Sequence, residues 1–271
     1  MTSNHQPSTT AGGLSSGLTI SECLDALDAE GRLLLKTIDG RRVEEKIPFC
    51  PGWNLRDMLT HLGYVYRWAA AIVAERRADR PSPEESRRFQ DPDPADGDAI
   101  ISRLNAAHRA MVQVLRQSTP SLKCWTIWAT PSAYSFWVRR MLHETVIHRV
   151  DAQNAGQLTT AAGNELNTRL AADGIDEMMC GFAQRYSKTL RANDPGTLVL
   201  VASDLGQTWW AQIGPDAPEF GRGPSPPSTD TEVLGRSGEL LLLLWNRRSA
   251  DGLKVRGRRD LLDTWARGAH L

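Results

Sequence analysis

Three residues with side chains that bind metals or protons recur at helical spacing in the middle of the chain: Glu144, His148 and Asp151. In a helix of 3.6 residues per turn, Glu144 and His148 lie about 40° apart around the axis, so both side chains project from one face. Asp151 continues this stripe near the predicted end of the helix, where the helix dipole disfavours a carboxylate. Polar side chains therefore occupy a stripe that should face the core, which predicts a functional site.

A further ligand for the same site is predicted from an earlier segment. His61 lies three residues after Met58 and four before Val65, on the apolar stripe of another predicted helix. Together with Glu144 and His148 it makes a set of two histidines and one carboxylate. Catalytic zinc sites use this ligand count and keep one coordination position open for water or substrate. The same set holds Fe(II) in oxygenases, so a site for oxygen chemistry is an alternative.

The remaining histidines of the helical segments have simpler interpretations. His108 lies on a stripe with Leu104 and Met111 and has no carboxylate partner in the pattern, so we expect a core histidine. His143 lies about 140° around the helix from His148 and is expected to lie outside the site. The two are also five residues apart rather than four, which excludes the H-E-x-x-H zinc-protease motif.

Amphipathic segments predicted as helices carry these residues. The segments cover about 19–39, 54–77, 98–119 and 133–154. A capping box at Thr19 to Glu22 begins the first, and Asn54 is a favourable N-cap for the second. The segment 81–97, rich in Pro, Asp and Ser, is expected to be a solvent loop. Four amphipathic helices in this arrangement predict a helical bundle.

The chain changes character after the fourth helix. We expect one long helix over 164–190, a Pro-rich loop over 215–230, and alternating short strands and helices to the C-terminus. The expected strands are 197–202, 209–213, 232–234 and 253–257, and the later helices are 238–246 and 260–267. The predicted fold class is therefore α+β. Its predicted parts are a disordered tail over 1–18, a bundle over 19–157 and a smaller α/β domain over 158–271.

Composition excludes several classes of partner. The 271 residues contain 32 Lys+Arg and 32 Asp+Glu, a balance that argues against nucleic-acid binding. The longest apolar run, 240–245, is far shorter than the roughly 20 residues needed to span a membrane. The four cysteines lie far apart with no C-x-x-C pair, and no secretion signal is present, so we expect reduced thiols in a cytoplasmic protein.

Two motifs resemble those of the mycothiol-dependent maleylpyruvate isomerase family, a branch of the DinB-like metalloenzymes. One is Pro51-Gly52-Trp53 followed by His61; the other is the E-x-x-x-H-x-x-D segment that begins at Glu144. The segment 238–263 is similar to the family's C-terminal domain. The resemblance implies a DinB-like four-helix bundle with a sterol-carrier-like α/β domain, and a divalent metal, usually zinc, bound by His61, Glu144 and His148.

The resemblance also implies that Arg247 of the C-terminal domain takes part in activity. Asn246 stands where the family commonly has glycine, and the adjacent Arg248 leaves the register of this arginine open. Asp151 is interpreted as a further ligand, a hydrogen-bond acceptor for a ligand imidazole, or a substrate contact.

The implied chemistry is the activation of a low-molecular-weight thiol, mycothiol, at the metal. The thiolate attacks a small electrophilic substrate, while Arg247 holds a carboxylate or a developing enolate. We favour a mycothiol-dependent S-transferase, with a maleylpyruvate-type cis–trans isomerase as the alternative. A bundle that binds small molecules without catalysis is a third interpretation.

Overall fold

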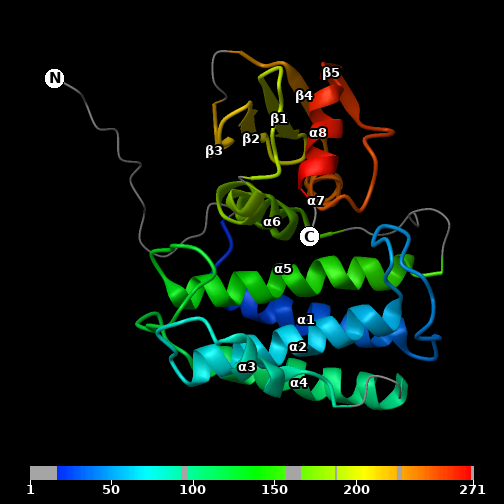
Figure 1. The fold of residues 1–271 in the computed structure, drawn as a ribbon, viewed down its shortest axis with the longest axis vertical. Helices are drawn as coiled ribbons and strands as arrows, with labels where there is room; N and C mark the ends of the chain where they lie inside the picture. The colour runs from blue at the N-terminus through cyan, green and yellow to red at the C-terminus, as the bar shows by residue number, and fades with distance from the viewer. Residues whose placement is uncertain (1–16, 93–96, 157–165, 187, 225–227, 270–271) are drawn as a thin grey trace.

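Two parts of the molecule are stacked on one another (Figure 1). The computed structural model describes residues 17–92, 97–156, 166–186, 188–224 and 228–269. Four long helices form the first part: α1 (Ile20–Ile38), α2 (Leu55–Ala74), α4 (Gly97–Gln117) and α5 (Ala133–Asn154). A sheet with three further helices forms the second part. Within the described ranges, no helix is long and apolar enough to cross a membrane.

The helices of the bundle begin where the sequence places capping residues. Thr19 and Glu22 form a capping box at the start of α1, and Asn54 and Asp57 form another at the start of α2. The four predicted bundle helices are thereby confirmed, each with its ends within a few residues of the expected positions. The predicted solvent loop after α2 is partly wrong, because a third capping box at Ser82 begins the short helix α3 (Pro83–Ser86).

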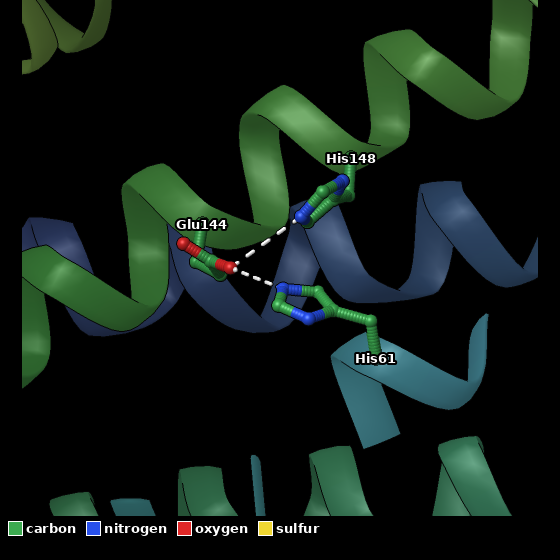
Figure 2. Close-up of side chains that lie close together, drawn as sticks. All are labelled: His61, Glu144 and His148. Carbon is green, nitrogen blue, oxygen red and sulfur yellow. Dashed lines mark hydrogen bonds and ion pairs between the residues drawn. The ribbon is translucent and has the colours of Figure 1, made fainter. Parts of the chain in front are cut away.

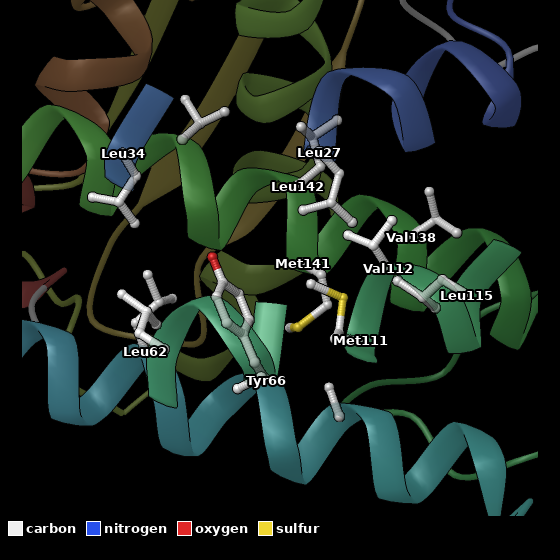
Figure 3. Close-up of a cluster of buried hydrophobic side chains, with 14 of the residues drawn as sticks. Leu27, Leu34, Leu62, Tyr66, Met111, Val112, Leu115, Val138, Met141 and Leu142 are labelled. Carbon is white, nitrogen blue, oxygen red and sulfur yellow. The ribbon is translucent and has the colours of Figure 1, made fainter. Parts of the chain in front are cut away.

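Apolar side chains from all four long helices fill the bundle core (Figure 3). Examples are Leu27 and Leu34 of α1, Leu62 and Tyr66 of α2, Met111 and Leu115 of α4, and Met141 and Leu142 of α5. His108 is a buried core histidine, as predicted, with Nε2 3.2 Å from the carbonyl oxygen of Leu27. It fits only because Gly31 has no side chain, since a Cβ there would lie 2.1 Å from His108 Nε2.

A mixed five-stranded sheet forms the centre of the C-terminal part. Its strands are β1 (Gly196–Ala202), β2 (Gln207–Ile213), β3 (Glu219–Arg222), β4 (Thr231–Gly235) and β5 (Lys254–Gly257). Their order is β3-β2-β1-β4-β5, and only the central pair β1 and β4 is parallel. The accompanying helices are α6 (Thr168–Cys180), α7 (Ser237–Leu244) and α8 (Asp260–Gly268). Figure 1 shows α6 between the sheet and α5.

Two expectations for the C-terminal part are wrong in detail. The long helix expected over 164–190 ends at Cys180, because Gly181 leaves the helical conformation and the indole of Trp128 packs against it. The loop expected over 215–230 contains β3, a four-residue edge strand that pairs with β2. The boundary expected near 157–158 and most of the expected tail lie outside the described residues.

Helix α5 is shared by the two parts. Most of its side chains are buried, and they include charged residues such as Arg140, Arg149 and Asp151. One side of α5 contributes to the bundle core, whereas Ile147 and Val150 belong to the core of the C-terminal part. A helix that is buried on all sides can hold polar groups away from bulk water. The polar side chains of α5 lie in such an environment.

Candidate metal centre

Side chains from two facing helices converge on one oxygen atom (Figure 2). His61 Nε2 of α2 lies 3.1 Å from Oε1 of Glu144 on α5, and His148 Nε2 lies 3.4 Å from the same oxygen. The three potential ligand atoms all lie within 4.8 Å of one another. The structure thus brings together the three predicted metal ligands, in the pairing that the i, i+4 spacing of Glu144 and His148 requires.

The second carboxylate oxygen of Glu144 is bound by an arginine. Arg140, one helical turn earlier, donates from Nη2 to Glu144 Oε2 over 2.6 Å. Burial by itself would raise the pKa of Glu144, but the Arg140 charge and hydrogen bonds from His148 and His61 outweigh it. The pKa of Glu144 is therefore held well below its usual value, and the carboxylate stays ionised.

A second buried chain of contacts reaches His148 from the C-terminal part. His148 Nδ1 lies 3.0 Å from Asp151 Oδ2. Arg247 donates hydrogen bonds to both oxygens of Asp151, from Nε over 2.8 Å and from Nη2 over 3.0 Å. Burial would raise the pKa of Asp151, but Arg247 and His148 lower it to about 2. Burial would lower the pKa of His148, but hydrogen bonds to Asp151 and Glu144 raise it to about 9.

A tight turn places an aromatic ring beside the two histidines. Trp53 N donates to the carbonyl of Cys50 over 2.9 Å, and Gly52 between them has φ +87°, as a type II turn with proline at its second position requires. The Trp53 ring centroid lies 5.1 Å from that of His61 and 6.3 Å from that of His148. Asn54, the N-cap of α2, follows directly after the turn. The turn and the N-cap together fix the start of the helix that carries His61.

The donor atoms fit a divalent metal. In a tetrahedral zinc site with bonds of about 2.0–2.1 Å, neighbouring donor atoms are about 3.3 Å apart, close to the separations around Glu144 Oε1. Each residue also presents a single suitable atom. Arg140 occupies the other oxygen of Glu144, and Asp151 fixes the ring of His148 so that Nε2 points to the centre. No other group of three potential ligands was found among the described residues.

A cavity of about 640 Å³ opens beside the two histidines, between the bundle and the C-terminal part. This volume lies within the usual range for small-molecule sites. Its described lining includes the aromatic rings of Phe49, Trp53, Tyr186 and Trp245. Arg247 and Arg248 also line it, and no carboxylate does among the described residues. The arrangement can therefore hold a small anionic molecule next to a metal ion.

Comparison with known families gives the decisive observation. The profile described as the mycothiol maleylpyruvate isomerase N-terminal domain matches residues 24–153. The profile of the C-terminal domain of the same family matches residues 169–264. The chain belongs to the mycothiol maleylpyruvate isomerase family. This membership confirms the predicted resemblance and supports the isomerase alternative more strongly than the S-transferase interpretation.

Solved structures show the same fold. The crystal structure of a mycothiol-dependent maleylpyruvate isomerase aligns with a TM-score of 0.62 at 15% identity, over 88% of this chain and 93% of that chain. A histidine-to-alanine mutant of a mycothiol-dependent maleylpyruvate isomerase aligns with the same TM-score and coverage at 13% identity. A search of curated proteins found no match.

The departure from the family pattern at Asn246 has a structural explanation. Asn246 has φ +55°, a conformation that favours glycine and that asparagine adopts more readily than most residues. The backbone N–H groups of Asn246 and Arg247 bond to the carbonyls of Leu243 and Leu242, which is the Schellman arrangement at the end of α7. Asparagine therefore allows the turn that brings Arg247 to Asp151.

The two candidate arginines lie in different surroundings. Arg247 reaches Asp151, whereas Arg248 donates to Glu239 and to the carbonyl of Asp251. The geometry thus favours Arg247 over Arg248 as the arginine of the site.

Cys50 also lines the cavity, but burial raises the pKa of its thiol to about 12, so the thiol is protonated at neutral pH.

Proposed function

We propose that this protein is a metal-dependent isomerase that uses mycothiol to convert a small unsaturated oxo acid, of the maleylpyruvate type, from cis to trans. Membership of the family supports the reaction class. The observation that carries the proposal is the position of His61 and His148, with Glu144 behind them, at the wall of a cavity lined by arginines and no described carboxylate. Arg247 and Arg248 each keep N–H donors beyond those that bond Asp151 and Glu239, and these donors favour an anionic substrate.

The thiol must be deprotonated to act as a nucleophile near neutral pH. A divalent metal held by His61, Glu144 and His148, for which we propose zinc, would lower the pKa of a bound thiol. Addition of the thiolate to one carbon of the double bond forms a C–S bond and moves the π electrons onto the conjugated oxo group as an enolate. The remaining single bond rotates, the enolate re-forms the double bond, and the thiolate leaves. Mycothiol is therefore regenerated in each turnover.

The residues of this chain hold and orient the reacting groups. Arg247 uses three of its five N–H donors in bonds to Asp151 and to the Trp245 carbonyl, and we assign its remaining donors to the substrate carboxylate or enolate. Asp151 is buried and paired on both sides, so we assign it as a positioning residue for His148 and Arg247. The Trp53 ring packs beside both histidine rings and limits their orientation.

Metal content tests the site directly. We expect one divalent ion per wild-type chain and none in His61→Ala or Glu144→Ala, measured by elemental analysis of folded protein. His143→Gln is the matched control, because His143 lies on the same helix but pairs with Asp173 of α6. Unchanged metal content in His61→Ala would refute the ligand assignment. Iron in the wild type, with oxygen uptake that depends on an oxo acid, would replace this proposal with the oxygenase alternative.

Consumption of the thiol separates isomerase from S-transferase. The metal-loaded protein is incubated with mycothiol and maleylpyruvate, and separately with mycothiol and a general electrophile. We expect the trans isomer to accumulate with a catalytic amount of mycothiol that is recovered unchanged. Stoichiometric loss of the thiol into an adduct would instead support the S-transferase. No turnover with any thiol and either substrate would refute both.

A further inference from the structure

The buried arginine that bonds Glu144 has a second carboxylate partner outside the candidate metal centre. Arg140 has a relative exposure of only 2%, and it lies between carboxylates from both parts of the molecule. Its Nη2 donates to Glu144 of α5 and its Nη1 donates to Glu177 of α6, over 2.6 and 2.5 Å. Arginine suits this position because its planar group can bond two carboxylates at once in fixed directions.

The contact constrains how Glu144 can bind a metal. Arg140 bonds only to Oε2, whereas both ligand histidines approach Oε1 (Figure 2). A metal between the histidines would therefore meet one oxygen of Glu144, while the other remains in its charge-assisted hydrogen bond. Without Arg140 the carboxylate could rotate and offer both oxygens, which changes the number of donor atoms around the metal.

The C-terminal part fixes the position of Arg140. Glu177 belongs to α6 and is itself buried. The guanidinium carbon of Arg140 also lies 5.2 Å from the ring centroid of Phe182 and 5.7 Å from that of Trp245. Glu177 neutralises part of the positive charge of Arg140. Glu144 therefore attracts a metal ion more strongly than it would if it were the only carboxylate bonded to Arg140.

We propose that Arg140, anchored by Glu177, is a positioning residue that makes Glu144 a one-oxygen metal ligand and thereby raises the affinity of the centre. This inference rests on the proposed metal centre. Together with the Arg247–Asp151–His148 contacts, it means that both ligands on α5 are oriented by α5 residues that Glu177 and Arg247 of the C-terminal part hold in place. The C-terminal part is then needed for metal binding itself, not only for substrate binding.

Titration of the metal-free full chain with Co²⁺, in competition with a chromogenic chelator, tests this role without any activity measurement. We expect Arg140→Met to weaken Co²⁺ binding by about 10–100-fold, the usual effect of losing a residue that orients a ligand. The visible spectrum of bound Co²⁺ should also change, because a two-oxygen Glu144 alters the coordination number. Arg140→Lys keeps the charge but cannot bridge both carboxylates, so an intermediate loss is expected.

Two further variants keep the test decisive. Glu177→Gln removes the anchor with little change of shape, and we expect weaker Co²⁺ binding in the same direction; it carries the test if Arg140→Met does not fold. Arg139→Met is the matched control, because Arg139 forms a partly buried pair with Asp173 across the same interface but has no hydrogen bond to His61, Glu144 or His148. Its Co²⁺ affinity should equal that of the wild type.

Three results would overturn the inference. Equal affinity and an equal spectrum in wild type, Arg140→Met and Glu177→Gln would show that Glu144 does not depend on Arg140. An equal loss of affinity in Arg139→Met would assign the effect to loosening of the interface. Failure of the wild type to bind either Co²⁺ or Zn²⁺ would refute the metal centre, and this inference with it.

Discussion

The buried pair of Asp151 and Arg247 gives a prediction whose size follows from the structure. Replacing Asp151 by Asn keeps the shape of the side chain and removes its charge. Asp151 is 1% exposed and accepts hydrogen bonds from His148 and Arg247, so both partners lose a charged acceptor. We therefore expect Asp151→Asn to lower the free energy of unfolding of the metal-free protein.

The pKa of Asp151 sets the expected magnitude. It falls from an ordinary 3.8 to about 2 in the folded protein, and each pH unit corresponds to about 1.4 kcal/mol, so the charge contributes roughly 2–3 kcal/mol at pH 7. Because the folded-state pKa is depressed, this contribution is complete above about pH 4 and is lost as the pH falls through about 2. Removing one partner of a buried ion pair typically costs about 3–5 kcal/mol, which is of the same order.

Urea denaturation of metal-free wild type and Asp151→Asn over a series of pH values measures this contribution. We expect a difference of roughly 2–3 kcal/mol between the two proteins at pH 7, constant down to about pH 4 and smaller at each lower pH. A difference that keeps its full size at the lowest pH at which the protein folds would show that lost packing, not charge, is responsible. No difference at pH 7 would refute the assignment of Asp151 as a paired carboxylate.

Three other predictions concern stability. In the metal-free protein, His148 with its raised pKa stabilises the fold fully below about pH 6.5. This contribution should be lost as the pH rises through about 9, and urea midpoints that do not fall over that interval would contradict it. Gly31→Ala should cost about 1–3 kcal/mol by overpacking against His108, visible as a lower Tm, and an unchanged Tm would contradict the close contact. Asn246→Val should be less stable than Asn246→Gly by about 1–2 kcal/mol, because only glycine accepts the positive φ without strain; equal urea midpoints would contradict that conformation.

The sequence predicts the ligand cluster because the spacing of residues along each helix shows which side chains share a face. Glu144 and His148 are one turn apart, and His61 lies on an apolar stripe that must face the bundle interior, so helical geometry predicts that all three face inward. The bundle helices are equally predictable, since capping boxes and apolar stripes determine where they begin and which side they bury. The periodicity of each helix predicts which side chains face the bundle interior, and the family resemblance adds that His61 of one helix meets Glu144 and His148 of another.

The parts that sequence reasoning misses depend on tertiary contacts. Arg140 could be noticed as one turn before Glu144, but its second partner Glu177 lies on a different helix. The sequence indicates Trp53 only as part of a motif, because its packing beside the histidines follows from the turn at Gly52. The end of α6 at Gly181 depends on the approach of Trp128 from a distant loop, which no local pattern records.

The position of α5 between two hydrophobic cores affects how the chain reaches its native state on the ribosome. When Asn154 has been added, all four bundle helices exist, but the residues that cover the other side of α5 have not been made. At about 5–20 residues per second, the 93 residues from Asn154 to Arg247 take roughly 5–19 seconds to synthesise. Until then, the residues that cover Ile147 and Val150 and that pair with Arg140 and Asp151 are incomplete. The candidate metal centre is therefore completed later than the bundle that carries its ligands.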